Sequence, residues 1–254
     1  MSDMGNEYTA IAALYDGFRG ESPNMWAAYL DELFGRFADK KPRTVLDLCC
    51  GTGTVTAALC RLGYDMIGID RSEEMLALAR EHAPSALLLH QDMRSIDLYG
   101  TVDAVVCCLD SINYLPEYGD VCRTFDSVSR FLNPGGLFIF DVNTKKRFAE
   151  KYGKNDFILE NKNGLIAWSC DYKPRLGRCD FYLSCFIPGA DGRYTRRDEE
   201  QSEYCYSDGQ LRAAAESGGF EVLAAYDRMA LHDADENSEK VHYILRKRDT
   251  EKDK

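Results

Sequence analysis

The segment from Val45 to Thr54 constrains what this 254-residue chain can fold into more than any other. It reads Val-Leu-Asp-Leu-Cys-Cys-Gly-Thr-Gly-Thr, an apolar run with an acid near its end, followed by two glycines and a helix-like start. A glycine turn lets backbone N–H groups approach a ligand closely, because glycine tolerates the dihedral angles and crowding that this requires. The pattern predicts a buried strand, a ligand-binding turn and a helix, in that order.

The glycine spacing discriminates between two kinds of ligand. A nicotinamide-dinucleotide turn needs three glycines, as G-x-G-x-x-G, over a pyrophosphate. This chain has no glycine at Cys49, Val55 or Thr56, and Asp47 at the strand end would repel a pyrophosphate. A ligand that carries a cation and no phosphate fits this turn better.

Strands alternate with helices along most of the chain. We expect strands over residues 44–48, 66–69, 86–89, 102–108, 137–142, 220–226 and 241–245. Helices are expected from Pro23 with Ser22 as cap, over 54–62, after the cap Ser72, over 118–132, and after the cap Ser207. This alternation predicts an α/β fold, with a doubly wound, Rossmann-like, seven-stranded and mostly parallel sheet.

The helical period disappears between residues 157 and 206. Segments 165–172, 178–187 and 194–204 are β-rich and are separated by turns that contain Pro and Gly. We therefore expect residues 151–206 to form an inserted antiparallel β lid over an acceptor. Residues 1–150 and 207–247 are expected to form the cofactor-binding core, and residues 248–254 a flexible tail.

Composition and charge disfavour several other function classes. The net charge of −11 argues against nucleic acid, because binding to it depends on neutralising phosphates. No apolar run reaches about 18 residues, and residues 1–6 lack a signal-peptide core, so we expect no membrane partner and a cytoplasmic location. The ten cysteines lack a C-x-x-C pair and the four histidines are scattered, so no metal site is expected. A small-molecule partner is favoured, and the oligomeric state stays open.

Three acids fall where strands of such a sheet end. Asp47 and Asp70 close the first two strands, and Asp92 follows the third strand within His-Gln-Asp-Met-Arg. Ligands of doubly wound sheets bind outside the carboxyl ends of the strands, so these acids are expected to share one crevice. The position of Asp70, about 20 residues after the turn, fits the ribose of NAD equally well. The pair Asp92-Met93, in contrast, is not a requirement of nicotinamide domains.

The glycine turn resembles motif I of the class I S-adenosylmethionine (SAM) methyltransferases, usually written hh-D-h-G-C-G-T-G, with Cys49 in place of the first glycine. Residues 68–76, 110–115 and 133–136 are also similar to that family, and the resemblance covers about residues 8–247. Within the family, the chain is most similar to small-molecule N-methyltransferases, including antibiotic aminosugar N,N-dimethyltransferases, and to uncharacterised bacterial relatives with the same β insertion. The resemblance implies SAM as the cofactor.

With SAM as cofactor, each of the three acids has an expected role. Asp47 is expected to order the ammonium end of SAM through water, and Asp70 to accept both ribose hydroxyls. The resemblance implies that Asp92 and Met93 hold the adenine.

The resemblance also implies contacts to the rest of the cofactor. The backbone carbonyl of Leu109 is expected near the SAM ammonium, Tyr15 is expected to close over SAM, and Arg19 to meet its carboxylate. The full expected cofactor-binding set is Tyr15, Arg19, Asp47, Cys49, Gly51, Gly53, Asp70, Arg71, Met75, Asp92, Met93 and Leu109.

The expected catalytic residues come from two segments. Asp110 and Tyr114 follow the fourth strand and are expected to face the crevice, and Glu199 comes from the insertion. Aminosugar methyltransferases carry histidine at the Tyr114 position, and related enzymes often carry histidine at that of Gln201. Tyrosine still orients an acceptor by hydrogen bonding, but it is a poor base at neutral pH. Glu199 and Gln201 either line the acceptor pocket or lie on an exposed edge strand.

These features predict methyl transfer from SAM to a small-molecule acceptor, with an amine favoured. Two alternatives remain open at this point. A non-catalytic SAM-binding module agrees with the missing histidines. An NAD-dependent oxidoreductase agrees with the position of Asp70 and disagrees with the glycine spacing.

Overall fold

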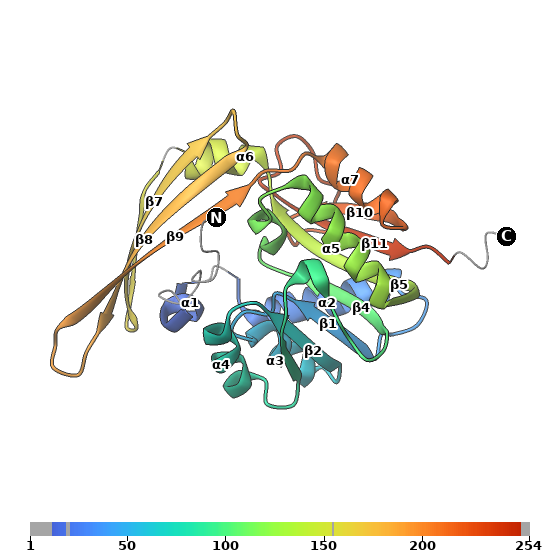
Figure 1. The fold of residues 1–254 in the computed structure, drawn as a ribbon, viewed down its shortest axis with the longest axis horizontal. Coiled ribbons are helices and arrows are strands. Elements are labelled where there is room, and N and C mark those ends of the chain that lie inside the picture. The colour runs from blue at the N-terminus through green and yellow to red at the C-terminus, as the bar shows by residue number, and fades with distance from the viewer. Residues whose placement is uncertain (1–11, 19–20, 154, 250–254) are drawn as a thin grey trace.

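A seven-stranded sheet forms the centre of the computed structural model, which describes residues 12–18, 21–153 and 155–249 (Figure 1). In spatial order it contains β10 (Phe220–Asp227), β11 (Lys240–Lys247), β5 (Leu132–Asn143), β4 (Val102–Cys107), β1 (Thr44–Leu48), β2 (Asp65–Asp70) and β3 (Leu87–His90). β11 pairs antiparallel with both of its neighbours, and the other pairs are parallel. The predicted seven-stranded, mostly parallel sheet is confirmed.

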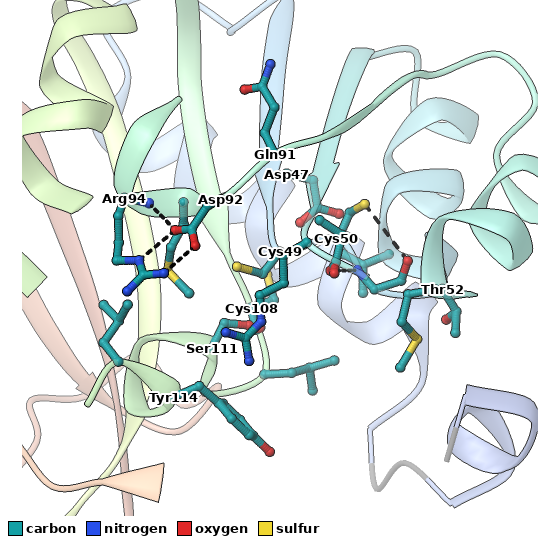
Figure 2. Close-up of a pocket in the computed structure, with 18 of the residues that line it drawn as sticks. Asp47, Cys49, Cys50, Thr52, Gln91, Asp92, Arg94, Cys108, Ser111 and Tyr114 are labelled. Carbon is teal, nitrogen blue, oxygen red and sulfur yellow. Dashed lines mark hydrogen bonds and ion pairs between the residues drawn. The ribbon is translucent and has the colours of Figure 1, made fainter. Parts of the chain in front are cut away.

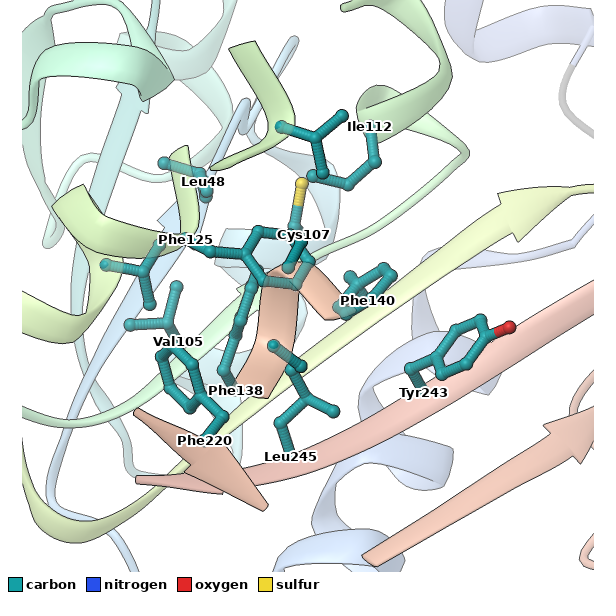
Figure 3. Packing of buried hydrophobic residues seen from close by; sticks show 14 of the residues in the cluster. Leu48, Val105, Cys107, Ile112, Phe125, Phe138, Phe140, Phe220, Tyr243 and Leu245 are labelled. Carbon is teal, nitrogen blue, oxygen red and sulfur yellow. The ribbon is translucent and has the colours of Figure 1, made fainter. Parts of the chain in front are cut away.

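Alternate residues of the central strands point to opposite faces of the sheet and so supply two apolar cores. On β4, Val105 and Cys107 belong to one core, and Ala104 and Val106 belong to the other. The first core lies against α5 (Tyr118–Phe131) and α7 (Asp208–Ser217), where Phe125 meets two phenylalanines of β5 edge-on (Figure 3). The second core lies against α2 (Pro23–Phe37) and α3 (Thr54–Arg61).

Serine caps fix where three helices begin. Ser22, Ser72 and Ser207 each accept a hydrogen bond from the backbone N–H three residues later. Ser72 starts α4 (Glu73–His82), whose first turn carries two glutamates, where the helix dipole favours negative charge. The end of β2 therefore lies directly beside a helix N-terminus. No helix in the described part of the chain is both long and apolar enough to cross a membrane.

Two regions differ from the sequence expectation. β5 begins at Leu132 and not at residue 137, because residues 133–136 form a bulge between two paired stretches of the same strand. After β5, Lys145–Arg147 form the short α6, which continues as a π-helical turn over Phe148–Tyr152. No helix is expected there from sequence, since so short a segment shows no helical period.

The following segment forms the extra antiparallel sheet. Its strands are β6 (Phe157–Asn161), β7 (Gly164–Lys173), β8 (Arg178–Pro188) and β9 (Tyr194–Tyr204), paired in that order; β6 is absent from the predicted segments. The apolar part of its inner face packs against Leu14 of α1 (Ala12–Phe18) and against Phe148 and Tyr152. In Figure 1 this sheet extends beyond the core, with α1 between it and α4.

Candidate active site

A pocket opens at the carboxyl ends of β1 and β4, the place where doubly wound sheets bind ligands (Figure 2). It encloses about 950 Å³, counted out to its open mouth. Nine predicted cofactor residues line it: Asp47, Cys49, Gly51, Asp70, Arg71, Met75, Asp92, Met93 and Leu109. The lining also includes residues absent from the prediction, namely Cys50, Thr52, Val55, Gln91, Arg94, Cys108, Ser111, Leu115 and Pro116.

The glycine turn is left-handed at three positions. The φ angles of Cys49, Gly51 and Gly53 are 63°, 53° and 72°. Gly53 lies outside the pocket lining, but a Cβ there would lie 2.8 Å from the Cβ of Ala79, so close packing of α3 on α4 requires glycine. Cys49 adopts the left-handed conformation at a cost of about 1–2 kcal/mol. The turn therefore persists although its first glycine is replaced.

Asp70 ties the end of β2 to the glycine turn. Its Oδ2 accepts the backbone N–H of Gly51 at 2.8 Å, and its Oδ1 accepts that of Ser72 at 2.9 Å. Burial raises the pKa of Asp70, while these N–H donors act to lower it. The carboxylate is thus held in the pocket wall by the protein itself.

Asp47 lies deeper in the same wall and is 2% exposed. Its Oδ2 accepts a hydrogen bond from the hydroxyl of Thr56 at 2.5 Å. Burial raises the pKa of Asp47 to about 7, and the charge of Asp70 acts in the same direction. A cation in the pocket would stabilise the ionised form of this acid.

Asp92 is paired with Arg94, which the sequence prediction omits. The Arg94 backbone N–H and Nε donate to Asp92 Oδ1 at 2.8 and 2.9 Å, and Arg94 Nη2 donates to Oδ2 at 2.6 Å (Figure 2). Burial acts to raise the pKa of Asp92, but the hydrogen bonds and charge of the Arg94 guanidinium hold it below its ordinary value. The arginine two residues after the acid was the available sequence signal.

The segment after β4 makes a second left-handed turn. Leu109 and Asp110 have φ angles of 62° and 57°, and the 3₁₀ turn η2 (Ser111–Tyr114) follows. Leu109, Ser111 and Tyr114 line the pocket, whereas Asp110 is absent from the lining. Its carboxylate instead accepts a hydrogen bond from Lys240 of β11, 130 positions away in the chain. The expectation that Asp110 faces the crevice is therefore wrong, because its carboxylate is paired with Lys240 instead.

Tyr114 connects the pocket to the antiparallel sheet. Its hydroxyl donates to Gln201 Oε1 at 3.1 Å, and Gln201 Nε2 donates to Glu199 Oε1. Glu199 and Gln201 are 7% and 6% exposed. The strand β9 is an edge of its sheet, but these two side chains are buried and do not lie on an exposed face. Neither of them is in the pocket lining itself, which they reach through Tyr114.

Glu203, two residues further along the same face of β9, is absent from the predicted site. It is buried, and its Oε2 accepts a hydrogen bond from Asn143 Nδ2 at 2.8 Å. Burial, and then the charge of Asp110, raise the pKa of Glu203 to about 8. The signal was the period of two in residues 199, 201 and 203, which puts their side chains on one face of a strand.

Arg19 and the side chain of Tyr15 lie outside the described part of the structure. The helix α1 is hydrogen-bonded both to the glycine turn and to the antiparallel sheet. Thr52 Oγ1 in the glycine turn donates to Asp16 Oδ1 at 2.7 Å. Asn161 Nδ2 on β6 donates to the carbonyl oxygen of Gly17 at 2.7 Å.

Known proteins are similar to this chain in sequence and in fold. Residues 45–136 match the family model described as a methyltransferase domain. An uncharacterized methyltransferase of Bacillus cytotoxicus is 30% identical over 54% of this chain and 68% of its own length. A putative methyltransferase of Geobacillus sp. (strain WCH70) is 27% identical over 94% of this chain and 99% of its own length.

A solved structure provides the comparison over the whole fold. The crystal structure of a SAM-dependent methyltransferase from Clostridium acetobutylicum is 27% identical, has a TM-score of 0.84, and covers 96% of this chain and 100% of its own. The chain belongs to the SAM-dependent methyltransferases.

The methyltransferase uses SAM as its cofactor, as the sequence resemblance implies. Its pocket fits this ligand, because the acids Asp47, Asp70 and Asp92 suit a cationic ligand that carries hydroxyl and amino groups. Neither a nicotinamide oxidoreductase nor a non-catalytic module agrees with these relatives.

Proposed function

We propose that this methyltransferase transfers the methyl group of SAM to a small-molecule amine held between the pocket and strand β9. The observation that carries the proposal is the hydrogen-bonded chain from Tyr114 through Gln201 to Glu199. It connects a pocket-lining residue to a buried carboxylate on the insertion. Water screens a buried carboxylate poorly, so it attracts a cation more strongly than a surface acid does.

The proposal assigns the walls of the site to two parts of the chain. Residues 1–150 and 207–247 form the cofactor core, and residues 151–206 form the lid over the acceptor. In the core, Asp70 accepts the ribose hydroxyls, Asp92 and Met93 hold the adenine, and Asp47 orders the ammonium through water. The Leu109 carbonyl, Tyr15, Arg19, Arg71, Met75 and the turn at Cys49, Gly51 and Gly53 complete the cofactor contacts.

Sequence similarity supports an amine as the acceptor class. The chain is 30% identical, over 51% of its length and 56% of the relative's, to a dTDP-3-amino-3,4,6-trideoxy-alpha-D-glucopyranose N,N-dimethyltransferase of Streptomyces venezuelae. Tyr114 stands where the resemblance gives histidine to aminosugar enzymes, and Gln201 where it often gives histidine to related enzymes. We therefore infer an amine acceptor that differs from that amino sugar.

The chemistry asks little of the protein beyond alignment. SAM supplies a methyl group already activated on a sulfonium. Tyr114 orients the acceptor and the walls exclude water. The amine reacts as the neutral form: its lone pair takes the methyl group as the sulfur–methyl bond breaks, and S-adenosylhomocysteine leaves as a neutral thioether. Glu199 stabilises the positive charge that develops on the nitrogen, whose extra proton then passes to solvent. A tyrosine is a poor general base at neutral pH, so Tyr114 contributes position and not proton abstraction.

A methyl-transfer assay over a panel of amines, hydroxyls and thiols, scored by S-adenosylhomocysteine release, tests this proposal. Tyr114→Phe is expected to lower turnover on the accepted substrate about 10–100-fold, with cofactor affinity nearly unchanged, because one orienting hydrogen bond is lost. Glu199→Gln is expected to act in the same direction on an amine and to matter less for a neutral hydroxyl.

The exposed neighbour Glu200 provides the control, and Glu200→Gln is expected to retain full turnover. Full activity of both Tyr114→Phe and Glu199→Gln would place the chemistry away from β9. Turnover on hydroxyls or thiols alone would refute the amine class.

A further inference from the structure

Lys240 is a buried cation in the last strand of the core. Its side chain is 10% exposed, and its Nζ lies 2.5 Å from Oδ1 of Asp110 and 2.7 Å from Oδ2 of Asp141. Burial alone would lower the pKa of Lys240, but the two carboxylates hold it above its ordinary value. The lysine is therefore charged at neutral pH, although it lies away from water.

Lys240 and Asp141 hold Asp110 at two points. The Asp110 carboxylate accepts from Lys240, and its backbone N–H donates to Asp141 Oδ2 at 3.0 Å. Asp110 also stands at the N-cap of η2, where an aspartate usually accepts a hydrogen bond from the first N–H groups of the helix. It makes no such bond here, because its carboxylate points to Lys240.

The segment held in this way is strained. Leu109 and Asp110 are consecutive left-handed residues that carry side chains. Such a conformation is unfavourable for them and persists only where the surrounding contacts enforce it. The turn directs the Asp110 carboxylate to Lys240, while Leu109 and Ser111 on either side line the pocket.

We propose that Lys240 is a positioning residue for the cofactor pocket. Acting through Asp110, it holds the left-handed turn that presents Leu109 and Ser111 to SAM. Lys240 is absent from the pocket lining, so its effect on the cofactor is indirect. The proposal concerns cofactor binding alone and does not depend on which acceptor the enzyme methylates.

Calorimetry with S-adenosylhomocysteine, without any acceptor, tests this role. Lys240→Met is expected to weaken binding about 10–100-fold, because the turn that presents Leu109 and Ser111 loses the contact that enforces its conformation. Lys240→Arg, which keeps the charge, is expected to restore part of the affinity. A folded Lys240→Met protein with the affinity of the native enzyme would overturn the proposal.

Lys247 provides a matched control on the same strand. Its Nζ donates to the carbonyl oxygens of Ser129 and Leu132, at the end of β11 remote from the pocket. Lys247→Met is expected to lower Tm but to leave the affinity for S-adenosylhomocysteine unchanged. An equal loss of affinity in both variants would indicate general destabilisation and would also overturn the proposal.

A double variant covers the case in which Lys240→Met does not fold. Lys240→Met with Asp141→Asn leaves one buried carboxylate, and therefore the same net charge as the native group of three. It is still expected to bind S-adenosylhomocysteine weakly, because the tie to the Asp110 side chain is lost; native affinity would refute the role.

A thermodynamic cycle then tests the route through Asp110. In an Asp110→Asn background, Lys240→Met is expected to cause much less additional loss than it causes alone. Fully additive losses would show that Lys240 does not act through Asp110.

Discussion

The two walls of the candidate site hold their acids in different ways. We call the pocket residues at the ends of β1, β2 and β3 the cofactor wall, and Glu199, Gln201 and Glu203 on β9 the insertion wall. On the cofactor wall the separations are short. Asp70 is bonded to the N–H groups of Ser72 and Gly51, 2 and 19 positions away in the chain, and Asp92 to Arg94, two positions away. On the insertion wall the separations are long. Asn143 holds Glu203 across 60 positions, and Tyr114 meets Gln201 across 87.

The two walls therefore depend on different steps of folding. The cofactor wall is shaped mainly by strand ends, caps and turns that form with their own segments. The insertion wall exists only once the antiparallel sheet has docked on the core. Substitutions in the cofactor wall should therefore change cofactor affinity and the free energy of unfolding. Substitutions in the insertion wall should change turnover and the pH dependence of stability.

The largest expected effect belongs to Asp70. Asp70→Ala removes the acceptor that we propose for two ribose hydroxyls, each hydrogen bond to a charged group being worth about 1.5–3 kcal/mol. We expect S-adenosylhomocysteine to bind about 100-fold more weakly, or worse, by calorimetry. Asp65→Ala, at the exposed opposite end of β2, is expected to bind normally. Native affinity of a folded Asp70→Ala protein would place the ribose elsewhere.

Gly53 tests whether the glycine turn is rigid for local reasons. Gly53→Ala adds a Cβ 2.8 Å from that of Ala79 at a φ of 72°, and we expect it to cost about 2–4 kcal/mol in urea unfolding. Gly63 has a φ of 90° with no atom within 4 Å of an added Cβ, so Gly63→Ala reports the dihedral cost alone. Equal losses in the two variants would mean that packing against Ala79 contributes nothing.

Glu203 tests the insertion wall through pH. The ordinary pKa is 4.5 and the folded value about 8, so between these pH values the unfolded state has lost a proton that the folded state retains. Glu203 therefore destabilises the fold progressively as pH rises through this window. Glu203→Gln is expected to raise Tm by a few degrees at pH 8 and to have no effect near pH 4. Glu200→Gln is the exposed control, and a matching pH-dependent gain there would contradict this assignment.

The smallest effect is expected at Cys49. In Cys49→Gly, relief of the left-handed side chain is offset by the greater entropy of an unfolded glycine. We expect the free energy of unfolding to change by less than about 1 kcal/mol and cofactor affinity to change little. Cys49→Val places a β-branched residue at the same φ and is expected to be clearly less stable. A large gain from glycine would mean that the native turn is more strained than its dihedral angles indicate.

The same contrast explains what the sequence could predict. Asp70, Ser72 and the glycine turn were recognisable because their geometry depends on neighbours in the chain. The core strands were predicted from their alternation with capped helices, and those of the insertion from β-rich segments between turns. The strand β6 and the β5 bulge were not predicted.

The tie between Lys240 and Asp110 was not predictable, because it depends on pairing between strands far apart in sequence. The burial of Glu203 likewise depends on where the insertion docks. Local chemistry was therefore sufficient for Asp70, Asp92 and the glycine turn, and insufficient for the tie that holds the Leu109 turn and for the insertion wall.

Helix α1 belongs to neither wall and is bound to both. Asp16 accepts from Thr52 of the glycine turn, Gly17 accepts from Asn161 of the insertion, and Leu14 packs in the core of that sheet. The seven residues of α1 therefore connect the two walls directly. Linkage is reciprocal, so whatever affinity the cofactor confers on the acceptor, the acceptor returns to the cofactor in the same ratio. The cofactor and the acceptor would then change each other's affinity by the same factor, although their sites are built from different parts of the chain.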